Sequence, residues 1–127
     1  MMKKIASFLI LMLIIVVLVG CSSSSPSKTV NGFYNAVNNG DYKKAISFFS
    51  SRVIQSVGIQ KLQLAIQYQK QYVDSKGGIK KLNIKDEQIY DKNALVVIEI
   101  QYGDGTSESG NVPLVKESGK WKIDLSK

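Results

Sequence analysis

The hydrophobic pattern of this 127-residue chain changes its period at Gly77-Gly78, and this change constrains the fold more than any other feature. Before the two glycines, apolar residues recur roughly every three or four positions, the spacing that places them on one face of a helix. After the glycines, apolar and polar residues alternate, as they do in half-buried strands. We therefore predict an α+β domain in which three N-terminal helices pack on a curved, four-stranded antiparallel sheet.

The predicted helices begin and end at residues that are common helix boundaries. The first helix ends at Gly40, where glycine supplies the left-handed backbone conformation. Asp41 is suited to cap a second, short helix that extends to Phe49, before a break at Ser50-Ser51. A third helix is predicted from Ile59 to Ser75. The apolar stripe of the first helix consists of Val30, Phe33, Tyr34 and Val37. Each of these helices has one apolar side that needs a second layer to cover it.

The clearest predicted strand runs from Ala94 to Tyr102, between turn signals at Asp91-Lys92-Asn93 and Gly103-Asp104-Gly105. The strand before it begins at Ile79 and is expected to be bulged near Asp86-Glu87. Alternation along the strands predicts which side chains face the helices. These are Val96, Ile98, Ile100, Val112, Leu114, Trp121, Ile123 and Leu125. Trp121 is therefore expected to anchor the core.

Three apolar residues are left on the opposite face of the predicted sheet, namely Leu95, Val97 and Val115. Apolar patches that no other element covers often mark interfaces. We predict that this face either forms a homodimer or docks another protein of the cell envelope.

The N-terminal residues carry the pattern of a secretory signal. Lys3-Lys4 precedes an apolar run from Ile5 to Val19, which is shorter than the roughly 20 residues that a spanning helix needs. The run ends in Leu18-Val19-Gly20-Cys21, which resembles the lipobox of bacterial lipoproteins. The resemblance implies that a diacylglyceryl group is attached to the Cys21 sulfur, followed by cleavage between Gly20 and Cys21. A single-span membrane anchor formed by the same run is the alternative.

These features divide the chain into a signal peptide (1–20), a flexible serine-rich tether (21–27) and a folded domain (28–127). The lipobox implies a location on the outer side of a bacterial cytoplasmic membrane. In Gram-negative bacteria, an aspartate directly after the lipidated cysteine resembles a signal that retains the protein in the inner membrane. This chain has Ser22 at that position, so transport to an outer membrane is also compatible with the sequence. The covalent lipid on Cys21 is the only prosthetic group that the sequence predicts.

The charge of the chain bears on its partners. The net charge is +7, and an exported basic protein meets anionic lipid or cell-wall polymer rather than nucleic acid. We predict that five lysines around the start of the sheet contact such a surface. They are Lys76, Lys80, Lys81, Lys85 and Lys92. The chain has no histidine, which removes the commonest metal ligand, and no metal site is predicted.

The sequence favours a binding domain over an enzyme. A general base must reach the proton that it abstracts, and no carboxylate falls on a position predicted to face the core. The alternative is a small enzyme or small-molecule carrier with a pocket near Tyr34 and Tyr42. Tyrosines on a helix stripe more often belong to the core with a solvated hydroxyl.

The order of several motifs resembles a known family. These are Phe33-Tyr34, Gly40-Asp41-Tyr42, Gly77-Gly78, Tyr102-Gly103-Asp104-Gly105 and Gly119-Lys120-Trp121-Lys122-Ile123. They are similar to those of small bacterial lipoproteins that carry a domain of unknown function with the nuclear transport factor two-like (NTF2-like, SnoaL-like, cystatin-like) fold. This resemblance implies a cone in which a curved sheet wraps the helices. Such folds host isomerases, dehydratases and pure binding modules, so the fold does not decide the function. Three alternatives therefore remain: a binding domain, a SnoaL-like enzyme or carrier, and an envelope accessory or exclusion factor.

Overall fold

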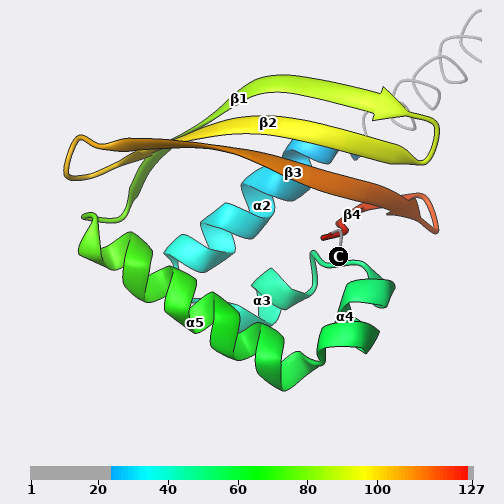
Figure 1. Ribbon diagram of the computed structural model, residues 1–127, viewed down its shortest axis with the longest axis horizontal. Coiled ribbons are helices and arrows are strands. Elements are labelled where there is room, and N and C mark those ends of the chain that lie inside the picture. Colours follow the sequence, from blue (N-terminus) through cyan, green and yellow to red (C-terminus); the bar gives the residue numbers. More distant parts are fainter. Residues whose placement is uncertain (1–23, 126–127) are drawn as a thin grey trace, which may run out of the picture.

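The computed structural model describes residues 24–125, in which a curved sheet lies over a layer of helices (Figure 1). The helices are α2 (Pro26–Asn38), α3 (Tyr42–Ile46), α4 (Ser51–Val57) and α5 (Ile59–Ser75). The strands are β1 (Ile79–Tyr90), β2 (Asn93–Tyr102), β3 (Ser107–Glu117) and β4 (Lys120–Ile123). The α+β class and the antiparallel sheet are as predicted, with one helix more than expected.

The additional helix, α4, begins where the sequence predicted a break. The Ser50 side chain is buried and accepts a hydrogen bond from the Val53 amide at 3.2 Å, which caps the new helix. The Ser51 amide and hydroxyl donate to the Glu117 carboxylate, which reaches across from the end of β3. The same serines that end the α3 segment therefore start α4, and α3 is shorter than predicted.

The first helix starts slightly earlier than the predicted domain boundary. The Ser25 hydroxyl accepts a hydrogen bond from the Lys28 amide, and Pro26 occupies the first turn, where its missing N–H costs nothing. Two residues of the predicted tether therefore belong to α2.

The four strands are hydrogen-bonded in the order β1-β2-β3-β4. Along β2, the predicted core-facing residues Val96, Ile98 and Ile100 are all buried. The pairing of β1 with β2 shifts register between Ile84 and Asp86, close to the predicted bulge, and again between Ile79 and Lys81. The two bulges bend β1 along the curve of the sheet.

The core lies between the inner face of the sheet and α2. Trp121 is buried there, as predicted, and its carbonyl accepts a hydrogen bond from the buried Thr29 hydroxyl at 3.0 Å. Phe33 of α2 meets the ring of Phe49 edge to face, with the ring centroids 5.3 Å apart. The first contact joins α2 to β4 and the second joins α2 to the segment before α4, so elements from both ends of the described chain form one core.

The two edges of the sheet differ. The β4 edge is covered by the segment before α4, because the Ser50 amide donates to the Ile123 carbonyl and the Ile123 amide donates to the Phe48 carbonyl, each at 2.8 Å. The other edge is β1, whose outer half is exposed from Lys85 to Tyr90.

Helix α5 packs on the other helices and meets the sheet mainly at its C-terminal end. There the Gly103 amide donates to the Gly78 carbonyl, and the Asp104 amide donates to the Lys76 carbonyl, each at 2.9 Å. These bonds tie the end of α5 to the turn between β2 and β3. Near this junction, the rings of Tyr72 and Tyr102 pack edge to face with centroids 6.1 Å apart. The rest of α5 lies across from the inner face of the sheet (Figure 1).

The C-terminal end of the described chain is held by a charged cluster, which predicts an acid sensitivity. Asp124 accepts a hydrogen bond from the Ser50 hydroxyl at 2.6 Å and pairs with Arg52 at 3.0 Å. Burial disfavours the charged carboxylate, but the hydrogen bonds from Arg52 and Ser50 outweigh burial and hold the pKa of Asp124 below its ordinary value of 3.8. Because the folded pKa lies below the unfolded one, the stabilisation by Asp124 is present above about pH 4 and is lost as the pH falls through the folded pKa.

Asp124→Asn is therefore expected to weaken the fall in stability on acidification. The measurement is the urea midpoint of the two proteins between about pH 7 and pH 3. Asp91→Asn, in the exposed turn between β1 and β2, is the matched control and is expected to follow the parent protein. An unchanged acid dependence in Asp124→Asn would show that other carboxylates control the acid transition.

Candidate binding site

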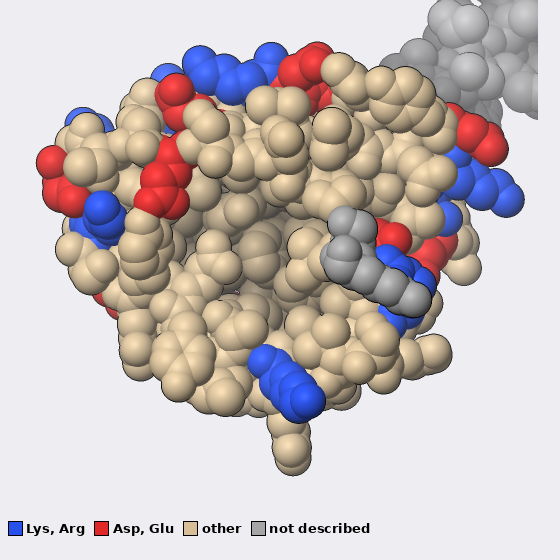
Figure 2. Space-filling view, viewed as in Figure 1, with Lys and Arg blue, Asp and Glu red and all other residues tan. Residues whose placement is uncertain are grey.

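The space between the sheet and α5 is hollow. Figure 2 shows the surface hollowed at this place, with uncharged residues forming its visible walls. The cavity has a volume of about 160 Å³. Its lining consists of Phe33, Tyr34, Phe49, Gln69, Asn111, Val112, Ile123 and Leu125. Aromatic and aliphatic side chains thus form most of the lining, and a phenol and two amides supply the hydrogen-bonding groups.

The tyrosine of this hollow is Tyr34, one of the two residues predicted to line a pocket. Its ring packs edge to face on Phe33, with centroids 5.2 Å apart. Burial raises the pKa of the Tyr34 hydroxyl, and the nearby negative charge of Glu108 raises it further. The hydroxyl therefore stays protonated at neutral pH and can both donate and accept a hydrogen bond.

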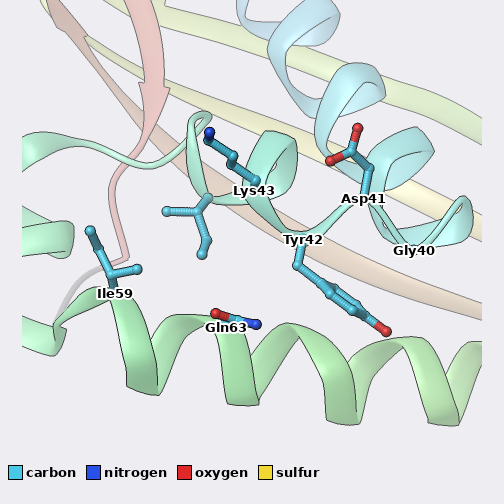
Figure 3. Close-up of a pocket in the computed structure, with 7 residues that line it drawn as sticks. Gly40, Asp41, Tyr42, Lys43, Ile59 and Gln63 are labelled. Atoms are coloured by element: carbon cyan, nitrogen blue, oxygen red, sulfur yellow. The ribbon is translucent and has the colours of Figure 1, made fainter.

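Tyr42, the other predicted pocket residue, lies at a different hollow. Figure 3 shows its side chain extending from the start of α3 toward α5, where Gln63 and Ile59 also line the space. This hollow between α3 and α5 has a volume of about 580 Å³. Asp41 lines it too, but its carboxylate accepts the Lys44 amide and caps α3. The structure therefore places the two tyrosines at separate hollows instead of one shared pocket.

A carboxylate that the sequence reasoning missed lies near the first hollow. Glu108 of β3 stands opposite the buried Ile100 of β2, on the inner face of the sheet. Its two oxygens accept hydrogen bonds from the hydroxyls of Tyr72 and Tyr102, the latter at 3.1 Å. Glu108 itself is exposed, so it lies at the rim of the inner face and not in the core. The residues just before Gly110 show no alternation of apolar and polar side chains. The sequence therefore could not show that they form a strand, or on which face of the sheet Glu108 lies.

Glu108 and its two tyrosines link α5 to the sheet. Burial is the largest reason why the pKa of Tyr102 is raised, and its hydrogen bond to Glu108 acts in the same direction. At Tyr72, which is exposed, the hydrogen bond to Glu108 is the main reason for a raised pKa. Both phenols therefore remain protonated donors, and the Glu108 carboxylate is engaged by both.

The five lysines predicted to contact an anionic surface are spread out. Lys76 follows α5, where its ammonium group lies 5.7 Å from the Tyr72 ring centroid. Lys80 and Lys81 lie at the start of β1, Lys85 pairs with Glu99 at 3.9 Å, and Lys92 lies in the turn after β1. At about 3.3 Å per residue, the 12-residue strand spans about 40 Å. The lysines therefore form a line along the sheet edge and not a cluster.

The predicted interface residues lie on the outer face of the sheet. Leu95, Val97 and Val115 are each partly exposed, and Leu95 stands opposite Pro113 of the neighbouring strand. The outer face also carries polar residues such as Glu99 and Asn111, so its apolar part is limited to these side chains and Pro113. A dimer or docked partner on it stays a prediction.

The predicted lipid site lies outside the described residues, because Gly20 and Cys21 precede residue 24. Among residues 24–125, no helix has the length and apolar character required to cross a bilayer. Within the same part of the chain, no three metal-binding side chains of the His, Cys, Asp or Glu type come together.

Comparison with protein families shows which family the chain belongs to. The profile of the family described as "Domain of unknown function (DUF4878)" matches residues 19–124. The chain belongs to the DUF4878 family. No curated protein matches the sequence significantly.

Solved structures similar to this DUF4878 domain have the NTF2-like fold. A Campylobacter jejuni protein with the provisional name NTF2-like transpeptidase has a TM-score of 0.70 and 22% identity, covering 81% of this chain and 100% of its own. The de novo designed NTF2 fold protein NT-9 has a TM-score of 0.56 and 15% identity, covering 82% and 87%. A designed protein with a curved β-sheet has a TM-score of 0.51 and 10% identity, covering 80% and 84%. At these identities the likeness shows the fold, so the DUF4878 domain is an NTF2-like domain of unknown function, as the motif order implied.

Proposed function

We propose that this DUF4878 protein is a lipid-anchored, extracytoplasmic binding protein that holds a small, mainly apolar group in the hollow beneath its sheet. The observation that carries the proposal is the lining of the hollow. Phe33, Phe49 and Val112 offer apolar contact, while Tyr34 and Gln69 offer hydrogen bonds. Ligand sites in proteins combine an apolar lining with a few polar groups in this way.

The size of the hollow limits which ligands can fit inside it. Its volume of about 160 Å³ is close to that of an engineered protein cavity, about 150 Å³, that accepts benzene. A single aromatic ring or a short branched chain with one hydroxyl or amide therefore fits inside. A longer ligand would place one end in the hollow and leave the rest at the open mouth.

Binding without catalysis is favoured by the state of Glu108. Both of its oxygens accept phenol hydroxyls, so acting as a general base would first require one of these hydrogen bonds to break. The SnoaL-like enzyme is the second candidate, because Glu108 and Tyr34 lie near the same hollow.

The location is proposed from the N-terminal sequence. Leu18-Val19-Gly20-Cys21 resembles a lipobox, and the serine-rich segment after it leads into α2. Lipid on the Cys21 sulfur would hold the domain at the outer surface of the membrane. An envelope accessory or exclusion factor is compatible with the same anchor.

Titration with phenol, which matches the hollow in size and carries one hydroxyl, tests the binding proposal. With the full chain in detergent micelles, phenol is expected to shift the methyl NMR signals of Val112 and Ile123. Gln69→Trp is expected to abolish these shifts because the indole fills the hollow, which Gln69 lines from α5.

Gln63→Trp is the matched control, because Gln63 lies on the same helix but lines the other hollow. This variant is expected to bind phenol as the parent does. Phenol shifts centred on Ile46 and Ile59, lost in Gln63→Trp and kept in Gln69→Trp, would assign binding to the α3–α5 hollow and contradict the proposal.

A further inference from the structure

One end of the sheet brings together the start of α2 and two hairpin turns. The Lys116 amide donates to the Lys92 carbonyl at 2.8 Å, so the β1–β2 turn lies beside the strand that leads into the β3–β4 turn. The Ser27 amide and hydroxyl both donate to Glu87, near the end of β1. Ser24 lines a surface hollow together with Lys116 and Lys120. The chain therefore enters the domain at this end of the sheet (Figure 1).

This hairpin end carries exposed lysines and exposed apolar side chains. We define it by Lys28, Ile89, Tyr90, Lys92, Lys116 and Lys120, all of which are exposed. Two carboxylates lie at the same end and keep their negative charge, namely Glu87, which accepts hydrogen bonds from Ser27, and Glu117, which accepts them from Ser51. Asp91 is the acidic residue of the β1–β2 turn. The four lysines outnumber these three carboxylates by one, and Tyr90 is the kind of side chain that is enriched at membrane–water interfaces.

The tether is too short to hold this end far from the anchor. Cys21 and Ser24 are three residues apart, and a fully extended chain of that length spans only about 10 Å. This distance is similar to the Debye length of about 8 Å at physiological ionic strength, so charges here sense an anionic surface. Lys80 and Lys81 lie at the opposite end of β1, about 30 Å further along the strand.

We propose that the hairpin end docks on the anionic phospholipid headgroups of the membrane that holds Cys21. The inference rests on the proposed lipid anchor. The lysines contact the phosphate groups, while Ile89 and Tyr90 lie at the level of the headgroups. Docking gives the domain one orientation, with the hairpin end at the membrane and the end of α5 away from it.

Lysine acetylation footprinting tests this orientation. The full lipidated chain is reconstituted into vesicles of phosphatidylcholine alone or mixed with phosphatidylglycerol, treated with an acetylating reagent, and digested for mass spectrometry. Acetylation of Lys28, Lys92, Lys116 and Lys120 is expected to slow at least about threefold in the anionic vesicles, because each lysine is attracted to the charged surface. Acetylation of Lys80 and Lys81 is expected to proceed equally in both vesicles.

Paired variants separate docking from a general charge effect. Lys92→Glu combined with Lys116→Glu is expected to restore fast acetylation of Lys28 and Lys120 in anionic vesicles. The matched control, Lys80→Glu combined with Lys81→Glu, makes the same charge change at the far end and is expected to leave the protection intact. Equal protection in both double variants would overturn the proposal.

The same digest distinguishes the two ways in which the idea can fail. If the peptide that begins at Cys21 carries the diacylglyceryl mass but the lysines of the hairpin end are not protected from acetylation, the docking proposal is contradicted and the proposed lipid anchor is supported. If that peptide lacks the lipid mass, the proposed anchor fails and the docking inference fails with it.

Discussion

Gly103→Ala is expected to lower the free energy of unfolding by about 2–3 kcal/mol, the range for forcing extra atoms into a packed site. A Cβ atom at Gly103 would lie 2.3 Å from the Gly77 carbonyl oxygen and 2.9 Å from its carbon. Both are backbone atoms, so no side chain can rotate away. The two chain segments must separate, and the junction that ties α5 to the β2–β3 turn is weakened.

Gly110→Ala is the matched control for this prediction. Gly110 also lies on the β2–β3 hairpin, but a Cβ there would meet only the Ile98 side chain, at 3.7 Å, an ordinary contact. Urea denaturation of the two variants and the parent measures the difference. If Gly103→Ala loses no more stability than Gly110→Ala, the close contact between the glycines does not hold the end of α5.

Cys21→Ser is expected to abolish maturation of the protein completely. Serine lacks the thiolate that accepts the diacylglyceryl group. In bacterial lipoproteins, cleavage ahead of the cysteine follows lipid attachment, so under the proposed anchor the variant is expected to accumulate with residues 1–20 retained. Intact-mass spectrometry of membrane fractions measures both changes in one experiment.

Ser22→Ala is the matched control for the cysteine variant, because it alters the adjacent residue and keeps the thiol. It is expected to carry the lipid and to begin at Cys21. Normal processing of Cys21→Ser would instead indicate an ordinary secretory signal and would contradict the proposed anchor.

The fold class could be predicted because its signals are local. The period change at Gly77-Gly78 separates helices from strands, and the alternation of Val96, Ile98 and Ile100 identifies the buried face of β2. Helix α4 could not be predicted in the same way. Ser51 at its start is held by Glu117, which is distant in sequence, and without that contact two serines indicate a break.

The candidate site was predictable only in part. Tyr34 was found because it lies on the apolar stripe of a helix. Glu108 was missed because the face of the sheet on which it lies follows from its pairing with Ile100 on the neighbouring strand. The hollow itself lies between the sheet and α5, whose C-terminal end is tied to the sheet by the close approach of Gly77 and Gly103, residues that are distant in sequence. Pairing of distant segments, more than local preference, therefore determines where the hollow forms.

The edges of the sheet have a consequence under the proposed lipid anchor, which would concentrate the protein on a membrane. Many copies attached to one membrane would meet edge to edge far more often than copies in solution. Within residues 24–125, the segment before α4 covers the β4 edge, which leaves β1 and the part of β3 that extends beyond β4 as the open edges. The β1 edge is bulged twice and carries Lys80, Lys81 and Lys85, which are features that hinder the addition of a foreign strand. These features therefore disfavour the joining of neighbouring copies through β1.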